Sequence, residues 1–418
     1  MPEKVKHVIK VKHVIIVGDG MADYPVESLG GKTPLMVAKT PRMDWMANQG
    51  EIGLARTIPD GFNPGSEIAN LSIFGYDPVR YYTGRGPLEA ASLKVKLGAD
   101  DIAFRCNLVT LKFQGNKVVM EDFSAGHITN EEAGKVIIDL DKEIGTNEIR
   151  FYAGVSYRHL MVLKNGAAKF SNLEELKIPP PHDIIGKEIS SYLPQAEGPV
   201  LSLMKESQRL LKNHPVNQAR EARGLPLANS IWLWGQGRSP QMIPLKERFS
   251  IDGYVISAVH LIKGIGILAG LEVMDVPGIT GYFDTNYDGK AQYTLKGLRE
   301  KDFVYVHVEA PDEASHMGNL RLKIEAIEAF DDKIVGTILD GMKEFKRYKV
   351  LVIPDHATPL SVRTHTADPV PFVIYSNEGG GGSGHGRTFD EVSAGQSGIF
   401  IEKGFELIER FLAPRCSC

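Results

Sequence analysis

The sequence predicts an α/β fold: a doubly wound, mostly parallel sheet with a second, α+β domain inserted into it. Three observations favour this fold. Short apolar runs resemble buried strands, a long amphipathic helix separates two of them, and the middle of the chain has a different pattern of apolar, charged and proline residues. At 418 residues the chain has room for two or three domains, and 43% hydrophobic residues can form a sizeable core.

Four short apolar runs indicate buried strands. The first, Val14 to Val17, ends just before Asp19. The later runs are Phe303 to Val308, Lys349 to Ile353, and Pro371 to Tyr375. Each is rich in β-branched or aromatic residues and is closed by polar or loop residues, so we expect buried parallel strands.

A strong amphipathic helix is predicted over Leu320 to Phe345, between the second and third of these strands. Its apolar positions recur at helical spacing. They are Ile324, Ile327, Phe330, Ile334, Ile338 and Met342. Strand, helix, strand is the pattern of a doubly wound sheet, in which functional residues collect at the carboxyl ends of the strands.

The middle of the chain predicts an inserted domain. Lys/Val alternation over Leu93 to Leu97 and a proline turn at Pro179 to Pro181 differ from the flanking pattern. We therefore predict one discontinuous domain over residues 1–92 and 240–418, and an inserted substrate-binding domain over 93–239. The glycine-rich stretch from Gly379 to Gly386 is either a mobile lid or a disordered connection.

Bulk charge and cysteine content exclude several classes of protein. With 48 basic and 52 acidic residues, a net charge of −4 offers no drive toward nucleic acid or anionic membranes. Three cysteines, Cys106, Cys416 and Cys418, form no disulfide framework. The sequence has neither a signal peptide nor an apolar run of membrane-spanning length, so a soluble cytoplasmic protein is expected.

Aspartate and histidine residues follow the predicted strands and form a candidate metal constellation. They are Asp19, Asp312, His316, Asp355, His356 and His365. Asp312 and His316 are four residues apart, which puts both on one face of a helical turn. Mixed oxygen and imidazole ligands suit manganese, zinc or magnesium-like ions, and six of them are enough for two ions.

A serine at a glycine turn is the candidate nucleophile. Gly65 precedes Ser66, and the residues that follow predict a helix start, where backbone amides favour a phosphate. Ser66 could also be a simple N-cap, with Asn70 a surface residue. A metal ion beside Ser66 would favour the nucleophile.

Taken together, these stretches resemble the alkaline phosphatase superfamily and, more narrowly, the archaeal-type, cofactor-independent phosphoglycerate mutases. The matching stretches run from the first strand to the last third of the chain. They are Gly18 to Met21, Gly65 to Asn70, Phe74 to Pro78, Tyr82 to Pro87, His307 to His316, Pro354 to Pro359, and Arg363 to His365.

The resemblance implies an isomerase that interconverts 3- and 2-phosphoglycerate through a phosphoserine at Ser66. Asp312, His316 and His365 would hold one divalent ion, and Asp19, Ser66, Asp355 and His356 the other. Manganese is expected first, with magnesium, cobalt or zinc as alternatives, and 2,3-bisphosphoglycerate is not required. The partner would be the small-molecule substrate, and self-association into a homo-oligomer is left open.

The resemblance also implies a substrate side made of cations, each of which could instead be an ordinary surface charge. These residues are His127, Arg158, Arg220, Arg223 and Lys263, with Arg105 as a further cation of the insertion. Guanidinium groups suit the phosphate and carboxylate of phosphoglycerate. The residue that accepts the substrate's hydroxyl proton is left unassigned. The alternatives are a metal-dependent phosphatase, another phosphomutase on the same core, or an inactive binding protein.

Overall fold

In the computed structural model the chain divides into two compact units. Unit 1 comprises Met1–Tyr82 and Met242–Cys418, and unit 2 comprises Thr83–Gln241. The structure describes residues 10–170, 172–194, 198–379 and 386–413. Among these residues, no helix combines the length and the apolar character that a bilayer crossing needs.

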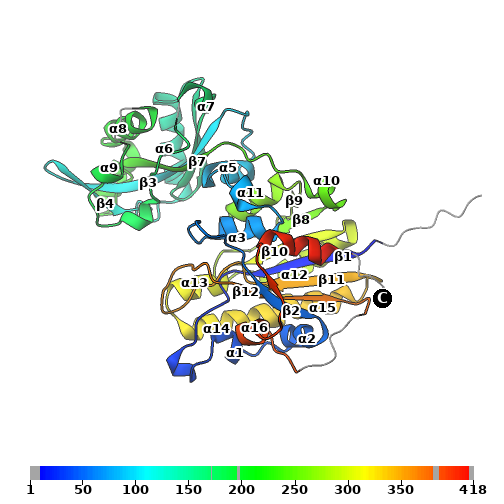
Figure 1. The fold of residues 1–418 in the computed structure, drawn as a ribbon. Coiled ribbons are helices and arrows are strands. Elements are labelled where there is room, and N and C mark those ends of the chain that lie inside the picture. The colour runs from blue at the N-terminus through cyan, green and yellow to red at the C-terminus, as the bar shows by residue number, and fades with distance from the viewer. Residues whose placement is uncertain (1–9, 171, 195–197, 380–385, 414–418) are drawn as a thin grey trace, which may run out of the picture. The chain divides into compact units, whose positions relative to one another are not determined.

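Unit 1 is built on an eight-stranded sheet with the order β13-β2-β12-β11-β1-β10-β8-β9 (Figure 1). Its strands are β1 Lys12–Gly18, β2 Glu51–Ala55, β8 Gly253–Ile256, β9 Glu272–Val273, β10 Phe303–Val308, β11 Tyr348–Ile353, β12 Val370–Ser376 and β13 Phe400–Ile401. The central strand β1 pairs in parallel with both β10 and β11. The predicted α/β class with a mostly parallel sheet is confirmed.

One strand runs against the prediction. β12, expected to be parallel, lies antiparallel between β11 and β2. Its residues are nearly all buried, as in the parallel strands, so its apolar pattern carries no information about its direction. Pro371 lies within this strand opposite Leu54.

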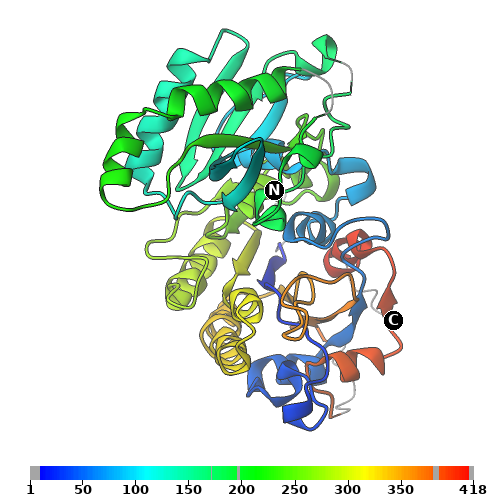
Figure 2. The same cartoon turned by 90° about the vertical axis from the view of Figure 1, so that its left-hand side faces the viewer.

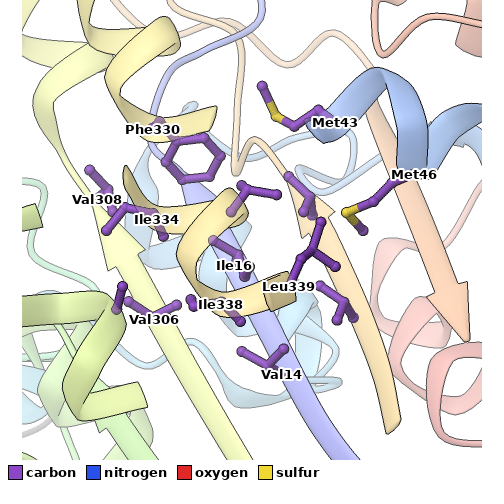
Figure 3. Packing of buried hydrophobic residues seen from close by; sticks show 14 of the residues in the cluster. Val14, Ile16, Met43, Met46, Val306, Val308, Phe330, Ile334, Ile338 and Leu339 are labelled. Atoms are coloured by element: carbon purple, nitrogen blue, oxygen red, sulfur yellow. The ribbon is translucent and has the colours of Figure 1, made fainter. Parts of the chain in front are cut away.

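Helices cover both faces of the sheet, which makes it doubly wound. The helices of unit 1 are α1 Pro34–Val37, α2 Pro41–Gln49, α3 Ser66–Ile73, α4 Pro78–Tyr81, α10 Leu245–Phe249, α11 His260–Leu268, α12 Tyr287–Glu300, α13 Ala310–His316, α14 Leu320–Ala329, α15 Thr337–Met342, α16 Glu391–Gly395 and α17 Leu407–Leu412. On one face Val14 and Ile16 pack with Met43 of α2 and Phe330 (Figure 3). In Figure 2 the yellow helices of this layer lie beside the blue α1 and α2.

The opposite face carries its own aromatic contacts. Tyr305 of β10 stacks on Phe74, which caps α3, with ring centroids 3.9 Å apart. His13 of β1 meets the ring of Phe411 in α17 edge-on at 5.5 Å. Alternating side chains of one strand therefore face different helices, and α3 lies against the strand face that carries Tyr305.

The predicted long helix is present but contains a π-helical segment. α14 continues through Phe330–Gly336 in π conformation into α15. A π turn holds more residues than an α turn, which suits apolar positions that recur every four residues from Phe330 onward. Asp331 in this segment accepts the backbone N–H groups of Arg42 and Met43 at the start of α2.

Unit 2 is an antiparallel sheet of five strands covered by helices. Its strands are β3 Ile102–Gln114, β4 Lys117–Asp122, β5 Ile149–Val155, β6 Arg158–Leu163 and β7 Ser230–Gly237. Its helices are α5 Arg85–Ser92, α6 Asn130–Glu143, α7 Gly166–Lys169, α8 Pro199–Leu211 and α9 Pro215–Ala222. It has its own core, which includes Trp232 of β7 and Val136 of α6.

The helix α5 belongs to unit 2, although the expected boundary after residue 92 would place it in the first domain. It packs on β3 and β7. Gly86 makes this approach close, because a Cβ there would lie 2.3 Å from the carbonyl oxygen of Ala103.

Some sequence features fall outside the described residues. These are Cys416, Cys418 and residues 380–385 of the glycine-rich stretch. Cys106 is a buried free thiol in β3, and burial raises the pKa of this thiol, as expected for a structural rather than reactive cysteine.

Candidate metal centre

The predicted aspartates, histidines and serine come together in unit 1. Asp19 follows β1, Asp312 and His316 lie on α13 after β10, and Asp355 follows β11. These three strands are neighbours in the sheet and run in parallel, so their carboxyl ends meet at one edge. Ser66 is the first residue of α3.

Asp312, His316 and His365 form one group. Nε2 of His316 lies 3.0 Å from Oδ2 of Asp312, and Nε2 of His365 lies 3.6 Å from the same oxygen. The two Nε2 atoms are 3.1 Å apart. Three ligand atoms that converge in this way suit one divalent ion.

The second group contains Asp19, Ser66, Asp355 and His356. Oγ of Ser66 lies 3.2 Å from Nε2 of His356. The same nitrogen is 3.4 Å from Oδ1 of Asp19 and 3.5 Å from Oδ2 of Asp355. The ring centroids of His356 and His365 are 4.1 Å apart, so the two groups are adjacent.

Neighbouring acceptors direct the imidazole lone pairs into these groups. Nδ1 of His316 lies 3.0 Å from the carbonyl oxygen of Arg363, which can only accept, so Nδ1 is the protonated nitrogen. Thr358 donates its hydroxyl to Asp312 at 2.5 Å and can therefore accept from Nδ1 of His356, 3.1 Å away. In both rings Nε2 is therefore the nitrogen that faces the carboxylate oxygens. The neutral form of each ring would offer its Nε2 lone pair to a divalent ion, so the residues present fit such an ion.

The pKa values reflect crowded buried charge. Burial and the neighbouring carboxylates of Asp355 and Asp312 raise the pKa of Asp19. Burial lowers the pKa of His356 to about 4, which leaves a neutral imidazole. The hydrogen bond to Asp312 raises the pKa of His316 to about 9. A bound cation would relieve the repulsion among these carboxylates.

Several residues that support the candidate ligands were not assigned this role from the sequence. Asn70 is buried, not a surface residue, and it donates to Oδ2 of Asp355 at 2.8 Å while Tyr305 donates to its amide oxygen. Gly20 has φ +61°, and a Cβ there would lie 2.4 Å from Oδ1 of Asp312. The spacing of Asn70 four residues after Ser66 was the available signal, because it puts both on one face of α3.

Of the predicted substrate-side residues of unit 2, three are exposed at its surface and Arg220 is buried. His127 is exposed on the turn after β4 and has φ 49°. Arg158 is exposed at the start of β6, with its guanidinium over the ring of Tyr157. Arg223 is exposed and lies 3.3 Å from Glu132.

Arg220 differs from these cations because its side chain is buried, with 2% exposed. Its guanidinium donates to Oε2 of Glu132 at 2.6 Å, to the carbonyl oxygen of Ala125 at 2.6 Å and to that of Pro226 at 2.8 Å. These contacts tie α9 to the turn that carries His127. In this structure Arg220 supports that turn and does not face the solvent.

Two further cations are engaged by acidic partners. Lys263 of α11, in unit 1, lies 3.4 Å from the carboxylate of Asp275. Arg105 of β3 is buried, forms an ion pair with Glu89 and lies over the ring of Trp234.

The fold and the ligand set define a divalent-metal enzyme of the α/β class, and comparison with known proteins narrows the class. The family model for 2,3-bisphosphoglycerate-independent phosphoglycerate mutase matches residues 47–217. A probable 2,3-bisphosphoglycerate-independent phosphoglycerate mutase of Geobacter sulfurreducens is 51% identical over 404 residues, which cover 96% of this chain and 100% of that protein. The 2,3-bisphosphoglycerate-independent phosphoglycerate mutase of Methanosarcina barkeri is 50% identical, over 95% of this chain and 98% of that protein. The chain belongs to the family of 2,3-bisphosphoglycerate-independent phosphoglycerate mutases.

Two solved structures align with nearly the whole chain. The PH0037 protein from Pyrococcus horikoshii aligns with a TM-score of 0.79 at 29% identity, covering 98% of this chain and 100% of that chain. A cofactor-independent phosphoglycerate mutase from Thermoplasma acidophilum aligns with a TM-score of 0.62 at 26% identity, covering 97% and 99%. The family resemblance predicted from the sequence motifs is confirmed.

Proposed function

We propose that this protein interconverts 3-phosphoglycerate and 2-phosphoglycerate by passing the phosphate through Ser66. Family membership supports the reaction, and one observation supports the nucleophile. Oγ of Ser66 lies at the first turn of α3, 3.2 Å from Nε2 of His356 and within the ligand cluster. The positive end of a helix dipole favours an arriving phosphate at this place.

Two divalent ions would complete the site. Asp312, His316 and His365 would hold one, and the other would be held by Ser66 with Asp19, Asp355 and His356. When bound, the ions supply positive charge that neutralises the phosphate and the serine oxygen. The mixture of oxygen and imidazole ligands favours manganese, with magnesium, cobalt or zinc as alternatives.

The chemistry consists of two transfers that need no water. Oγ of Ser66 forms a bond to phosphorus as the bond from phosphorus to the substrate's 3-oxygen breaks. The serine's proton ends on that oxygen, giving phosphoserine and glycerate. After the glycerate reorients, its 2-oxygen forms the new bond to phosphorus and the 2-hydroxyl proton returns to Ser66. Atoms and charge balance without a co-reactant.

Unit 2 would retain the glycerate between the two transfers. Its exposed cations His127, Arg158 and Arg223 suit a carboxylate and a phosphate. Arg220 would act through the turn that carries His127, because its own guanidinium is occupied by protein acceptors. The cytoplasmic location, a homo-oligomeric state and a substrate contact of Lys263 stay predictions.

A coupled assay tests this function. Enolase, which consumes 2-phosphoglycerate, would report product formation from 3-phosphoglycerate with added Mn²⁺. Wild type should be active, Ser66→Ala inactive, and mass spectrometry of enzyme quenched during turnover should find phosphate on Ser66. Ser72→Ala is a matched control, because Ser72 is buried on the same helix. Normal turnover in Ser66→Ala, or phosphate on another residue, would reject the proposal.

A further inference from the structure

A buried row of charged and polar side chains leads from α12 to the metal centre. It contains Lys290, Glu309, His307 and Asp19, none of which is more than 5% exposed. Lys290, Glu309 and His307 have no role in the proposed chemistry. Polar side chains buried this deeply are costly unless their neighbours compensate them.

Glu309 is held by contacts to both of its carboxylate oxygens. Nζ of Lys290 donates to Oε2 at 2.7 Å and to the carbonyl oxygen of His307 at 2.8 Å. Oε1 accepts from Oγ of Ser257 and from the backbone N–H of Ala258, both at 3.0 Å. These contacts hold the carboxylate of Glu309 in one position next to the candidate metal centre.

His307 lies between this fixed carboxylate and the candidate ligands. Its side chain is fully buried, with Nδ1 3.3 Å from Oε1 of Glu309. Nε2 is 3.4 Å from Oδ2 of Asp19 and 3.8 Å from Oδ2 of Asp355. Within the described residues, neither ring nitrogen makes a hydrogen bond of good geometry. An imidazole buried in this way faces carboxylates on both sides.

The two oxygens of Asp19 are divided between different neighbours. Oδ2 faces His307, whereas Oδ1 is 3.4 Å from Nε2 of His356. Oδ1 is buried and has no hydrogen-bond partner among the described residues, as suits an oxygen directed at a cation. Because β10 alternates its side chains, His307 reaches Asp19 from the strand face that also carries Tyr305.

We propose that His307 is a positioning residue: its imidazole lies against Oδ2 of Asp19 and so leaves Oδ1 directed at the ion held with Ser66. Glu309, fixed by Lys290 and Ser257, sets the orientation of the imidazole. The inference rests on the proposed two-ion site. Residues that orient ligands from behind in this way typically change metal affinity by about 10- to 100-fold when they are removed.

Calorimetric titration of the metal-free full chain with Mn²⁺ tests the inference. Wild type should bind two ions. His307→Leu should raise the Kd of one ion by about 10- to 100-fold and leave the other unchanged. His307→Gln, whose amide offers an N–H near the position of Nε2, should recover most of the affinity. His13→Leu is the matched control: His13 is a buried histidine on β1 with both ring nitrogens unpartnered among the described residues, at the opposite end of the strands.

Electron paramagnetic resonance of Mn²⁺ bound to protein carrying ¹⁵N-labelled histidine separates positioning from direct ligation. The number of coupled histidine nitrogens should be the same in wild type and His307→Leu. A lost coupling would make His307 a ligand, and an unchanged Kd for both ions would make it a packing residue; either result overturns the inference.

Should His307→Leu not fold, Glu309→Gln is titrated in its place, with the same expected loss at one ion. Fewer than two ions in wild type would instead overturn the proposed site itself.

Discussion

Nδ1 of His356 lies 3.1 Å from the hydroxyl of Thr358, and that hydroxyl donates to Asp312 at 2.5 Å. The threonine therefore links the two candidate ion sites and sets which nitrogen of His356 faces Ser66. Removing the hydroxyl frees the imidazole to take the other tautomer or another orientation.

We expect Thr358→Val to lower kcat and the affinity for Mn²⁺ by about 10- to 100-fold, because an outer contact orients the ligand. Thr358→Ser keeps the hydroxyl and should stay near wild type. Enolase-coupled kinetics and calorimetric titration measure the two effects. A loss in Thr358→Ser, with Thr358→Val near wild type, would mean that the methyl group, and not the hydroxyl, matters at this position.

Removing metal should abolish activity and lower stability together. Without ions, Asp19, Asp312 and Asp355 repel one another in a buried site, and a cation that binds only the folded state stabilises it. At a free Mn²⁺ concentration of 100 times Kd the gain is about 2.7 kcal/mol per ion. Activity and melting temperature would be followed during chelation and readdition of Mn²⁺. Full activity after exhaustive chelation contradicts a metal-dependent mechanism.

Much of the candidate metal centre was predictable because it depends on strand ends. Asp19, Asp312 and Asp355 each follow a recognisable buried strand, and the carboxyl ends of parallel neighbours must meet. The direction of β12 was not predictable in this way. A strand buried on both faces has the same apolar composition whether it runs parallel or antiparallel to its neighbours.

The burial of individual polar residues was harder to predict from the sequence than the direction of a strand. Arg220 has the same sequence signature as an exposed helical arginine, and only its contacts with Glu132 and Ala125 reveal an interior position. His307 carried a weak signal. It lies two residues before Glu309 at the end of an apolar strand, a spacing that puts both side chains on one face, but nothing in the sequence shows that Lys290 lies behind them.

Arg220 should be important for stability. Replacing it with Met removes one of the two cations that contact Glu132 and takes the donor from the carbonyl oxygen of Ala125, and a buried acceptor left without its donor costs about 1–3 kcal/mol. The exposed Arg223→Met contacts the same carboxylate and should cost less than about 1 kcal/mol. Denaturant unfolding of both variants provides the comparison. Equal small losses would show that Arg220 does not support the turn.

Acid should destabilise the protein through buried neutral histidines. Burial lowers the pKa of His13 from 6.5 to about 4, with Lys349 acting in the same direction and Asp302 against it. Burial and the charge of Arg105 lower the pKa of His159 to about 3. Both are neutral in the folded state and become protonated in the unfolded chain below about pH 6.5, so their contribution is lost as pH falls from 6.5 toward 4 for His13 and toward 3 for His159.

His13→Phe removes one of these groups and keeps a ring against Phe411. Between pH 7 and pH 5, wild type should lose about 2 kcal/mol more unfolding free energy than this variant. Denaturant unfolding of metal-free protein at both pH values measures the difference, since other groups cancel between the two chains. A pH dependence that is the same in both would show that His13 does not titrate on unfolding.

The exposed cations of unit 2 should decide whether the phosphate returns to glycerate or goes to water. A well-oriented acceptor can reach an effective molarity of about 10⁵ M or more, which exceeds what free water offers. Arg158→Ala or Arg223→Ala loosens the glycerate and should lower the mutase rate while raising the share of turnovers that end in inorganic phosphate. Both products would be measured in one reaction, with Arg209→Ala as the control, because Arg209 is an exposed arginine of α8 that pairs with Glu206 three residues before it. A proportional fall in both products would assign these arginines to binding alone, and a wild type that releases mostly inorganic phosphate would make the protein a phosphatase.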